Sequence, residues 1–257
     1  MTHAIPDNFN NGLKMKIAVM GSGGVGGFYG GLLARAGAEV TFVARGAHLA
    51  AMRERGLLIE NETQGNTEIR NVRVTEDPAS IGVVDLVLIA VKLWDLDAAV
   101  HAVKPLVGPQ TAVLSLQNGV IKDDILRRAF GDRAVMGGVG YVATHISRPG
   151  VIRQVGTLQR LIFGEYDGVS SARVEALLAL ALKAGLQAES VSDIHQTGIF
   201  FSGLYQHLLS FAGQGFEPFD GIFITAMFTP HSAEGTQFIE IRGSSKFFFY
   251  QFKFFFG

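Results

Sequence analysis

The sequence contains no cysteine, and its charges nearly cancel to a formal net charge of -1 over 257 residues. The missing thiol excludes disulfides, thiolate zinc sites and cysteine nucleophiles. The balanced charge does not point to nucleic acid or to an anionic membrane as a partner. No Asp/His cluster has metal-ligand spacing, and Ser22 and Ser115 have no evident base. The sequence therefore predicts no metal site and no hydrolase triad.

Long apolar runs are missing as well. No segment reaches the roughly 18 uninterrupted apolar residues that a transmembrane helix needs. Residues 1–14 are polar and lack the apolar run of a signal peptide. We interpret them as a leader that precedes the fold, and we expect a cytoplasmic protein with no membrane partner.

From residue 15 to residue 193, short apolar runs alternate with segments of helical spacing. This alternation is typical of an α/β domain of the Rossmann type, with a doubly wound, mostly parallel sheet. Residues 16–20, a helix that stops at Gly37, and residues 39–44 form one complete βαβ unit. We expect further strands at 57–60, 69–75, 85–92, 111–117 and 133–144, an antiparallel hairpin at 150–156 and 158–164, and further helices at 47–56, 94–106, 120–129 and 172–186.

A glycine-rich segment, GSGGVG at 21–26, matches G-x-G-x-x-G between the first strand and the first helix. Gly21 permits the tight turn, Gly23 lets the backbone approach a pyrophosphate, and Gly26 lets the helix pack closely on the strand. The start of the helix favours negative charge. The alternative is a purely structural turn. The predicted pyrophosphate-binding residues are Gly21, Ser22, Gly23, Gly24, Val25 and Gly26.

The end of the second strand indicates which dinucleotide is bound. NAD enzymes usually place an Asp or Glu there for the ribose 2′-hydroxyl. This sequence has Ala44, Arg45 and Gly46 instead, and Glu39 lies at the opposite end of the strand. Arg45 can make charge-assisted hydrogen bonds to a 2′-phosphate, although a solvated surface arginine is the alternative. The pattern favours NADP(H).

Two polar residues stand at the ends of other predicted strands: Lys92 is the last residue of 85–92, and Asn118 follows 111–117. In an open α/β sheet the ligand lies outside the carboxyl ends of the strands, so both are candidate ligand contacts. A surface lysine and an Asn-Gly turn are the alternatives. His101 and His145 are candidate acid–base groups, but neither lies at a clean strand end.

Four blocks in order resemble the ketopantoate reductase (2-dehydropantoate 2-reductase) family: residues 16–46, AVKLWDLDAAV, LSLQNGV and MGGVGYVATHISRPGVIRQVG. The resemblance runs from about Lys16 to Asp193. It implies that 21–26 hold the pyrophosphate, that Arg45 contacts the 2′-phosphate, and that Lys92 and Asn118 contact cofactor. It also implies that Asn118 lies near the substrate and that the backbone of Ala143 lies beside the nicotinamide.

The same resemblance implies NADPH-dependent reduction of a small-molecule 2-oxo acid, most closely 2-dehydropantoate to pantoate, in pantothenate biosynthesis. In the family, a lysine on the first helix of an all-helical second domain supplies the proton. Here residues 193–201 contain no lysine, and the next one downstream is Lys246. The catalytic residue is therefore unidentified. A non-catalytic NADP-binding protein and another hydroxyacid or opine-type dehydrogenase remain alternatives.

The composition changes at about residue 194. Fifteen of the 20 phenylalanines lie at 195–257, with no sustained helical or strand period. We interpret 15–193 as an NADP-binding Rossmann domain and 194–257 as a short atypical or truncated segment in place of the all-helical domain. We favour an out-of-frame or erroneous tail, with a degenerate end and a divergent domain as alternatives. A homodimer is compatible with the sequence, which does not determine the oligomeric state.

Overall fold

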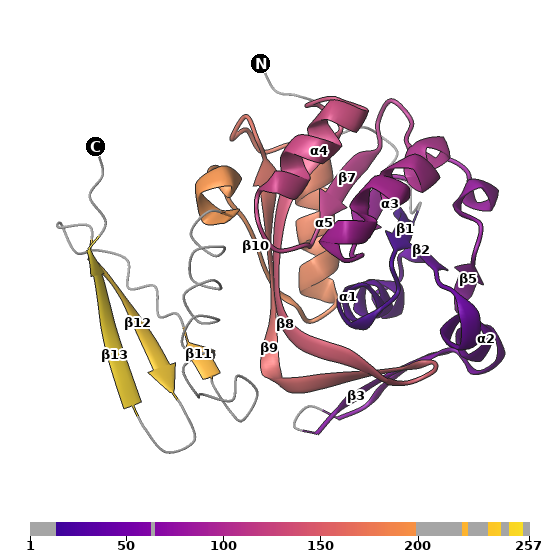
Figure 1. The fold of residues 1–257 in the computed structure, drawn as a ribbon, viewed down its shortest axis with the longest axis horizontal. Coiled ribbons are helices and arrows are strands. Elements are labelled where there is room, and N and C mark those ends of the chain that lie inside the picture. The colour runs from indigo at the N-terminus through magenta and orange to yellow at the C-terminus, as the bar shows by residue number, and fades with distance from the viewer. Residues whose placement is uncertain (1–13, 63–64, 199–222, 226–235, 243–246, 254–257) are drawn as a thin grey trace. The chain divides into compact units, whose positions relative to one another are not determined.

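The computed structural model of the chain describes residues 14–62, 65–198, 223–225, 236–242 and 247–253 (Figure 1). The chain divides into two compact units, Met1–Ser202 and Gly203–Gly257. The first unit contains a ten-stranded sheet with helices, and the second contains a three-stranded sheet. No helix among the described residues is long and apolar enough to cross a membrane.

Parallel strands in the order β5-β2-β1-β6-β7-β8 form the centre of the large sheet. The chain starts in the middle, at β1, adds β2 and β5 on one side, and then adds β6, β7 and β8 on the other. This is the doubly wound Rossmann order, and it confirms the predicted fold class. The bounds are β1 Lys16–Met20, β2 Glu39–Val43, β5 Arg73–Thr75, β6 Leu86–Ile89, β7 Ala112–Ser115 and β8 Val135–Arg148.

Helices cover both faces of this sheet because successive side chains of a buried strand point to opposite sides. On β1, Ile17 and Val19 pack into a core with α1, α2 and α5, whereas Ala18 and Met20 pack into a second core with α3 and α4. The helices are α1 Gly24–Arg35, α2 Gly46–Arg55, α3 Leu96–Val103, α4 Ile121–Phe130 and α5 Ala172–Lys183, with short 3-10 turns at Pro78–Ile81, Leu93–Asp95 and Lys104–Leu106.

β8 and β9 (Val151–Glu165) form a long antiparallel hairpin. Its outer part, which we call the arm, passes α1 toward α2 (Figure 1). The predicted hairpin of 150–156 and 158–164 is wrong, because both segments belong to β9 and the hairpin turn lies at Pro149-Gly150. The break at residue 157 is a bulge: between Tyr141 and Ala143 the register on β9 jumps from Arg160 to Val155. Nonlocal pairing with β8 keeps both halves in one strand.

The predicted strand at 69–75 is also wrong. Asn71 has a φ of 57°, and the segment splits into β4 (Thr67–Ile69) and β5. β4 pairs with β3 (Leu57–Asn61), which in turn pairs with β9, as does β10 (Gln187–Ser190). The sheet is therefore mixed at this end and curls around α1.

Glycines let strands surround α1 in this way. A Cβ on Gly30 would come within 2.7 Å of the Phe42 ring, and one on Gly27 within 2.9 Å of Ile152 on β9. Residues 26–33 of α1 are all buried. The dinucleotide-binding helix is thus held from both sides, and its first turn is positioned by the packing of the whole sheet.

The second unit contains β11 (Phe223–Thr225), β12 (Thr236–Arg242) and β13 (Phe247–Lys253) in antiparallel order. Residues 1–13 and most of 194–257 lie outside the described residues. The leader, the boundary at residue 193 and the atypical character of the C-terminal segment therefore stay predictions.

Candidate dinucleotide-binding site

The glycine-rich loop connects the end of β1 at Met20 to the start of α1 at Gly24. Gly21 has a φ of 95°, and a Cβ there would lie 2.8 Å from Val91. A Cβ on Gly26 would overlap the carbonyl oxygen of Gly21, whereas one on Gly23 would meet nothing within 4 Å. Gly21 and Gly26 are needed for the local packing, and Gly23 faces open space that a pyrophosphate could use.

Ser22 fastens this loop to the neighbouring strand. Its backbone N–H and its hydroxyl both donate to the carbonyl oxygen of Val43, at 3.3 and 2.8 Å. On the other side, the loop touches the arm, since a Cβ on Gly24 would come within 2.5 Å of the Thr144 carbonyl oxygen. The start of α1 has no side-chain cap and no acidic residue in its first turn. Its first N–H groups can therefore serve an anion.

Arg45 is the exposed N-cap residue of α2, two residues after β2 ends at Val43. The first turn of α2 has no acidic residue and no side-chain cap. Glu39 lies at the far end of β2, where it pairs with Arg73. The helix dipole and the guanidinium thus both favour an anion at this end of β2.

Lys92 and Asn118 lie in two adjacent loops that follow β6 and β7. Both strands are shorter than predicted, so each residue is exposed and lies three positions beyond its strand, which ends at Ile89 or Ser115. Gln117, which the sequence interpretation missed, donates its side-chain N–H to the Val91 carbonyl at 2.8 Å and joins the loops. The parallel pairing of β6 and β7 places both residues on the carboxyl side of the sheet.

Ala143 lies exposed on β8, next to the Thr144 backbone that touches Gly24. The arm therefore carries Ala143 to the rim of the glycine-rich loop. All the predicted cofactor-binding residues lie on the carboxyl side of the parallel strands, in the loops or in the arm that overhangs them.

A sequence profile described as "Ketopantoate reductase PanE/ApbA" matches residues 17–168. The chain belongs to this family. It is 35% identical over 202 residues to a 2-dehydropantoate 2-reductase of Mesorhizobium japonicum and 34% identical over 180 residues to one of Pyrococcus horikoshii. Each match covers 70% of this chain, and respectively 61% and 57% of the relative.

Solved structures of the family agree with this assignment. The crystal structure of 2-dehydropantoate 2-reductase from Porphyromonas gingivalis has a TM-score of 0.67 and 34% sequence identity, and the match covers 70% of this chain and 65% of that one. The chain thus spans about three fifths of the length of the curated relatives that it matches. The family resemblance drawn from the sequence is confirmed.

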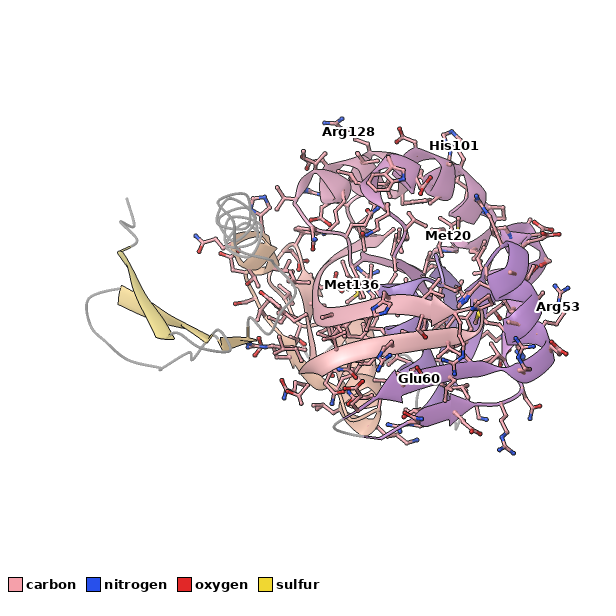
Figure 2. The ribbon with its side chains drawn as sticks, turned by 60° about the horizontal axis from the view of Figure 1, so that its bottom comes forward. Met20, Arg53, Glu60, His101, Arg128 and Met136 are labelled. Carbon is pink, nitrogen blue, oxygen red and sulfur yellow. The ribbon has the colours of Figure 1, made fainter. Side chains whose placement is uncertain are left out.

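Of the two candidate histidines, His101 lies on α3, away from the glycine-rich loop, whereas the backbone nitrogen of His145 would lie 3.0 Å from a Cβ on Gly24. His101 is exposed in the last turn of α3 and points outward (Figure 2), with its Nδ1 2.8 Å from the Asp97 carbonyl oxygen. His145 is exposed on β8, opposite Arg153. We therefore do not assign His101 or His145 as the general acid.

A third histidine, His48 on α2, is half-buried beside the glycine-rich loop, and the sequence interpretation missed it. The backbone N–H of Gly150 donates to its Nδ1 at 3.1 Å. Burial lowers the pKa of His48, and the backbone of Ser22 opposes that shift. No local pattern distinguishes it from a surface helix residue, because its partners lie far away in the sequence.

A buried ion pair at the start of α4 was missed for the same reason. Lys122 Nζ lies 2.7 Å from Asp123 Oδ1, and these side chains are 3% and 10% exposed. Burial lowers the pKa of Lys122, which Asp123 opposes. Burial also raises the pKa of Tyr166, assisted by its hydrogen bond to Asp123. The pair anchors the helix that follows the Asn118 loop.

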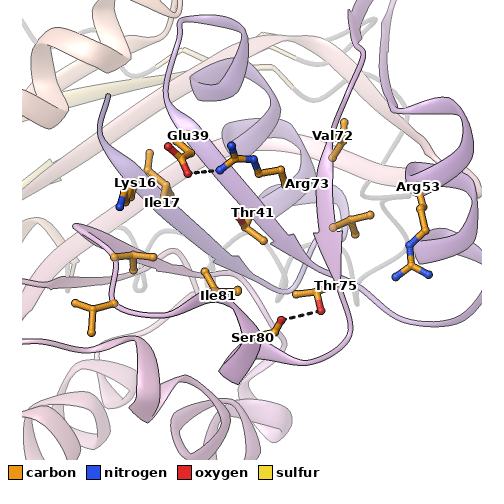
Figure 3. A pocket seen from close by; sticks show the side chains of 13 residues that line it. Lys16, Ile17, Glu39, Thr41, Arg53, Val72, Arg73, Thr75, Ser80 and Ile81 are labelled. Carbon is orange, nitrogen blue, oxygen red and sulfur yellow. Dashed lines mark hydrogen bonds and ion pairs between the residues drawn. The ribbon is translucent and has the colours of Figure 1, made fainter. Parts of the chain in front are cut away.

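A groove of about 470 Å³ lies elsewhere on the molecule (Figure 3). Lys16 and Glu39, the first residues of β1 and β2, line it together with Arg73, Thr41 and Ile81. It opens along the face of these strands toward their amino ends, whereas the glycine-rich loop follows their carboxyl ends. We therefore do not assign the dinucleotide to this groove. The described residues contain no cluster of three or more potential metal ligands of the types His, Cys, Asp and Glu.

Proposed function

We propose that this chain binds NADP(H) across the carboxyl ends of its parallel strands and uses it to reduce a small 2-oxo acid, most closely 2-dehydropantoate to pantoate. The observation that carries the proposal is the start of α2, where Arg45 stands at an uncapped helix end without any acidic residue in the first turn. The names of the relatives, 2-dehydropantoate 2-reductases, support the substrate class.

The cofactor fits as two anions at two helix ends. The pyrophosphate would lie over Gly23 at the start of α1, where no Cβ blocks its approach. The 2′-phosphate would lie at the start of α2, where Arg45 can make a bidentate, charge-assisted contact. An NAD-type site would instead need a carboxylate after β2, and this chain has Ala44 and Arg45 there.

The substrate would lie beside the nicotinamide, between the arm and the two loops that follow β6 and β7. When bound, the nicotinamide supplies the hydride for the ketone carbon. Lys92 and Asn118 would hold cofactor, and Asn118 would also donate a hydrogen bond to the substrate, while the Ala143 backbone would bound the nicotinamide. The chain would hold the nicotinamide and the 2-oxo acid in the orientation needed for hydride transfer, and it would exclude water.

Reduction also needs an acid that protonates the carbonyl oxygen. The family resemblance implies a lysine soon after Asp193, and residues 193–201 contain none. This absence favours one second candidate, an NADP-binding protein without turnover. A dehydrogenase for another hydroxyacid is a further alternative within the same scaffold.

The deciding experiment follows NADPH consumption by the purified protein with 2-dehydropantoate and titrates NADPH binding on the same sample. Turnover supports the reductase and assigns a working acid to this chain. Binding without turnover supports the NADP-binding protein. Absence of both overturns the proposed function.

A further inference from the structure

His48 links two segments that are distant in the sequence. It lies in the first turn of α2, three residues after Arg45, and that turn is closed by the Leu49 N–H donating to the Arg45 carbonyl at 3.2 Å. Its Nδ1 accepts the backbone N–H of Gly150 from the turn of the arm, at 3.1 Å. The ring therefore joins the start of α2 to the arm.

The segments beside His48 are themselves fixed. The Gly150 carbonyl accepts the N–H of Leu58 on β3 at 3.0 Å, and a Cβ on Gly150 would lie 3.1 Å from Ala51 of α2. Ser22, whose backbone acts on the pKa of His48, is bonded twice to Val43. A ring hydrogen-bonded to a fixed backbone segment can set the position of the helix that carries it.

The hydrogen bond also determines the state of the ring. An N–H donor at Nδ1 requires that this nitrogen be unprotonated, so the neutral ring carries its proton on Nε2. Nε2 is buried and makes no hydrogen bond within the described part of the chain. Two residues before Gly150, Arg148 of β8 pairs with Glu60 of β3 at 2.7 Å.

We propose that His48 is a positioning residue for cofactor choice: through its bond to Gly150 it holds the first turn of α2, and with it Arg45, where a 2′-phosphate binds. This inference rests on the proposed NADP(H) function. It extends that function to a residue that needs no contact with the cofactor. Because this hydrogen bond acts on the Arg45 end of the site, its loss weakens the binding of NADP+ more than the binding of NAD+.

The test compares binding of NADP+ and NAD+ by isothermal titration calorimetry at neutral pH. His48→Leu removes the acceptor while keeping an apolar group of similar size, and His48→Asn places an amide oxygen where Nδ1 stands. His101→Asn is the matched control, because that histidine is exposed on α3. Arg45→Ala gives the ratio of the two dissociation constants that is expected when the 2′-phosphate contact is lost. Thermal unfolding of each variant verifies that it is folded.

We expect His48→Leu to raise the dissociation constant for NADP+ by about five- to tenfold, the equivalent of one hydrogen bond, and to leave that for NAD+ unchanged. His48→Asn and His101→Asn keep the wild-type ratio of the two constants. The inference is overturned if His48→Leu weakens the binding of NADP+ and NAD+ equally, or if His48→Asn binds NADP+ as weakly as His48→Leu does.

The two proposals fail in different ways. Wild-type protein without any preference for NADP+ overturns the proposed cofactor, and the inference on His48 falls with it. A wild-type preference for NADP+ that His48→Leu leaves intact overturns the inference alone.

Discussion

Lys122 and Asp123 illustrate how much a single buried charge depends on its partner. Removing two charges from water is costly, and their attraction compensates only while both are present. Asp123 also helps to raise the pKa of Tyr166, so its loss affects a second polar group besides Lys122. The neighbouring Asp124 lies in the same first turn of α4 but is exposed. The two aspartates therefore separate burial from the effect of the helix dipole.

We expect Asp123→Ala to lower the free energy of unfolding by about 3–5 kcal/mol, because Lys122 is left buried and unpaired. Asp124→Ala should cost less than about 1 kcal/mol, the range of an exposed dipole interaction. Urea unfolding at neutral pH measures both. The double change Lys122→Met with Asp123→Leu should recover most of the loss. Equal costs for the two alanine variants would show that the ion pair is not energetically coupled.

His48 makes stability depend on pH in a defined direction. Burial lowers its pKa in the folded protein below the ordinary value of 6.5. Between the folded pKa and 6.5 the unfolded chain therefore binds more protons, so stability increases with pH across that window and is lost as pH falls below 6.5. Thermal melts of wild type and His48→Asn measure this. The Asn variant should lose less stability on acidification, and parallel curves would contradict the assigned shift.

His48 and Lys122 also show where sequence patterns stop being informative at the residue level. Gly21, Gly23 and Gly26 could be interpreted directly, because a tight turn and close helix–strand packing leave a local signature. The burial of Lys122 depends on the helix face that meets Tyr166, and the role of His48 depends on Gly150, 102 positions away. Neither relation has a local periodicity.

At the scale of elements, the predictions that rest on local sequence signals are correct, and those that depend on pairing between distant segments are wrong. The first βαβ unit was predicted nearly to the residue because Gly37, with a φ of 110°, ends its helix locally. β9 was split in two because its bulge, held by the bond from Gln154 Nε2 to the Leu158 carbonyl at 2.9 Å, looks like a turn in the sequence. Only the pairing with β8 shows that the strand continues.

The glycine-rich loop allows a prediction in which similar substitutions have opposite consequences. Gly26→Ala should destabilise the fold strongly, because its methyl group would overlap the Gly21 carbonyl. Gly23→Ala should fold with a nearly unchanged melting temperature, because its methyl group meets nothing within 4 Å. The open space in front of Gly23 is where the proposed pyrophosphate would lie, so this variant should bind NADPH at least about tenfold more weakly.

Thermal melts and NADPH titrations on both variants separate packing from binding. A Gly23→Ala protein that binds NADPH as well as wild type would place the pyrophosphate elsewhere. A Gly26→Ala protein of wild-type stability would show that the loop can relax away from the strand, contrary to the packing seen between α1 and the sheet.

At the scale of the whole molecule, the chain divides into two units, and the candidate site belongs to one of them. The described residues proposed to bind cofactor run from Gly21 to Ala143, within the unit Met1–Ser202. The family match ends at residue 168, also inside this unit. The relatives are longer than this chain, so their activity as whole proteins does not by itself assign turnover here.

A chain that stops at Ser202 should therefore bind NADP+ with the same dissociation constant as the full chain. The shorter chain retains the ten-stranded sheet, the glycine-rich loop, Arg45 and the arm that positions His48. Calorimetric titration of the two proteins tests this, and 2-dehydropantoate turnover by each shows whether residues 203–257 contribute an acid. Equal binding with turnover in the full chain alone would assign the acid to 203–257. Loss of binding in the shorter chain would instead mean that those residues help to form the cofactor site.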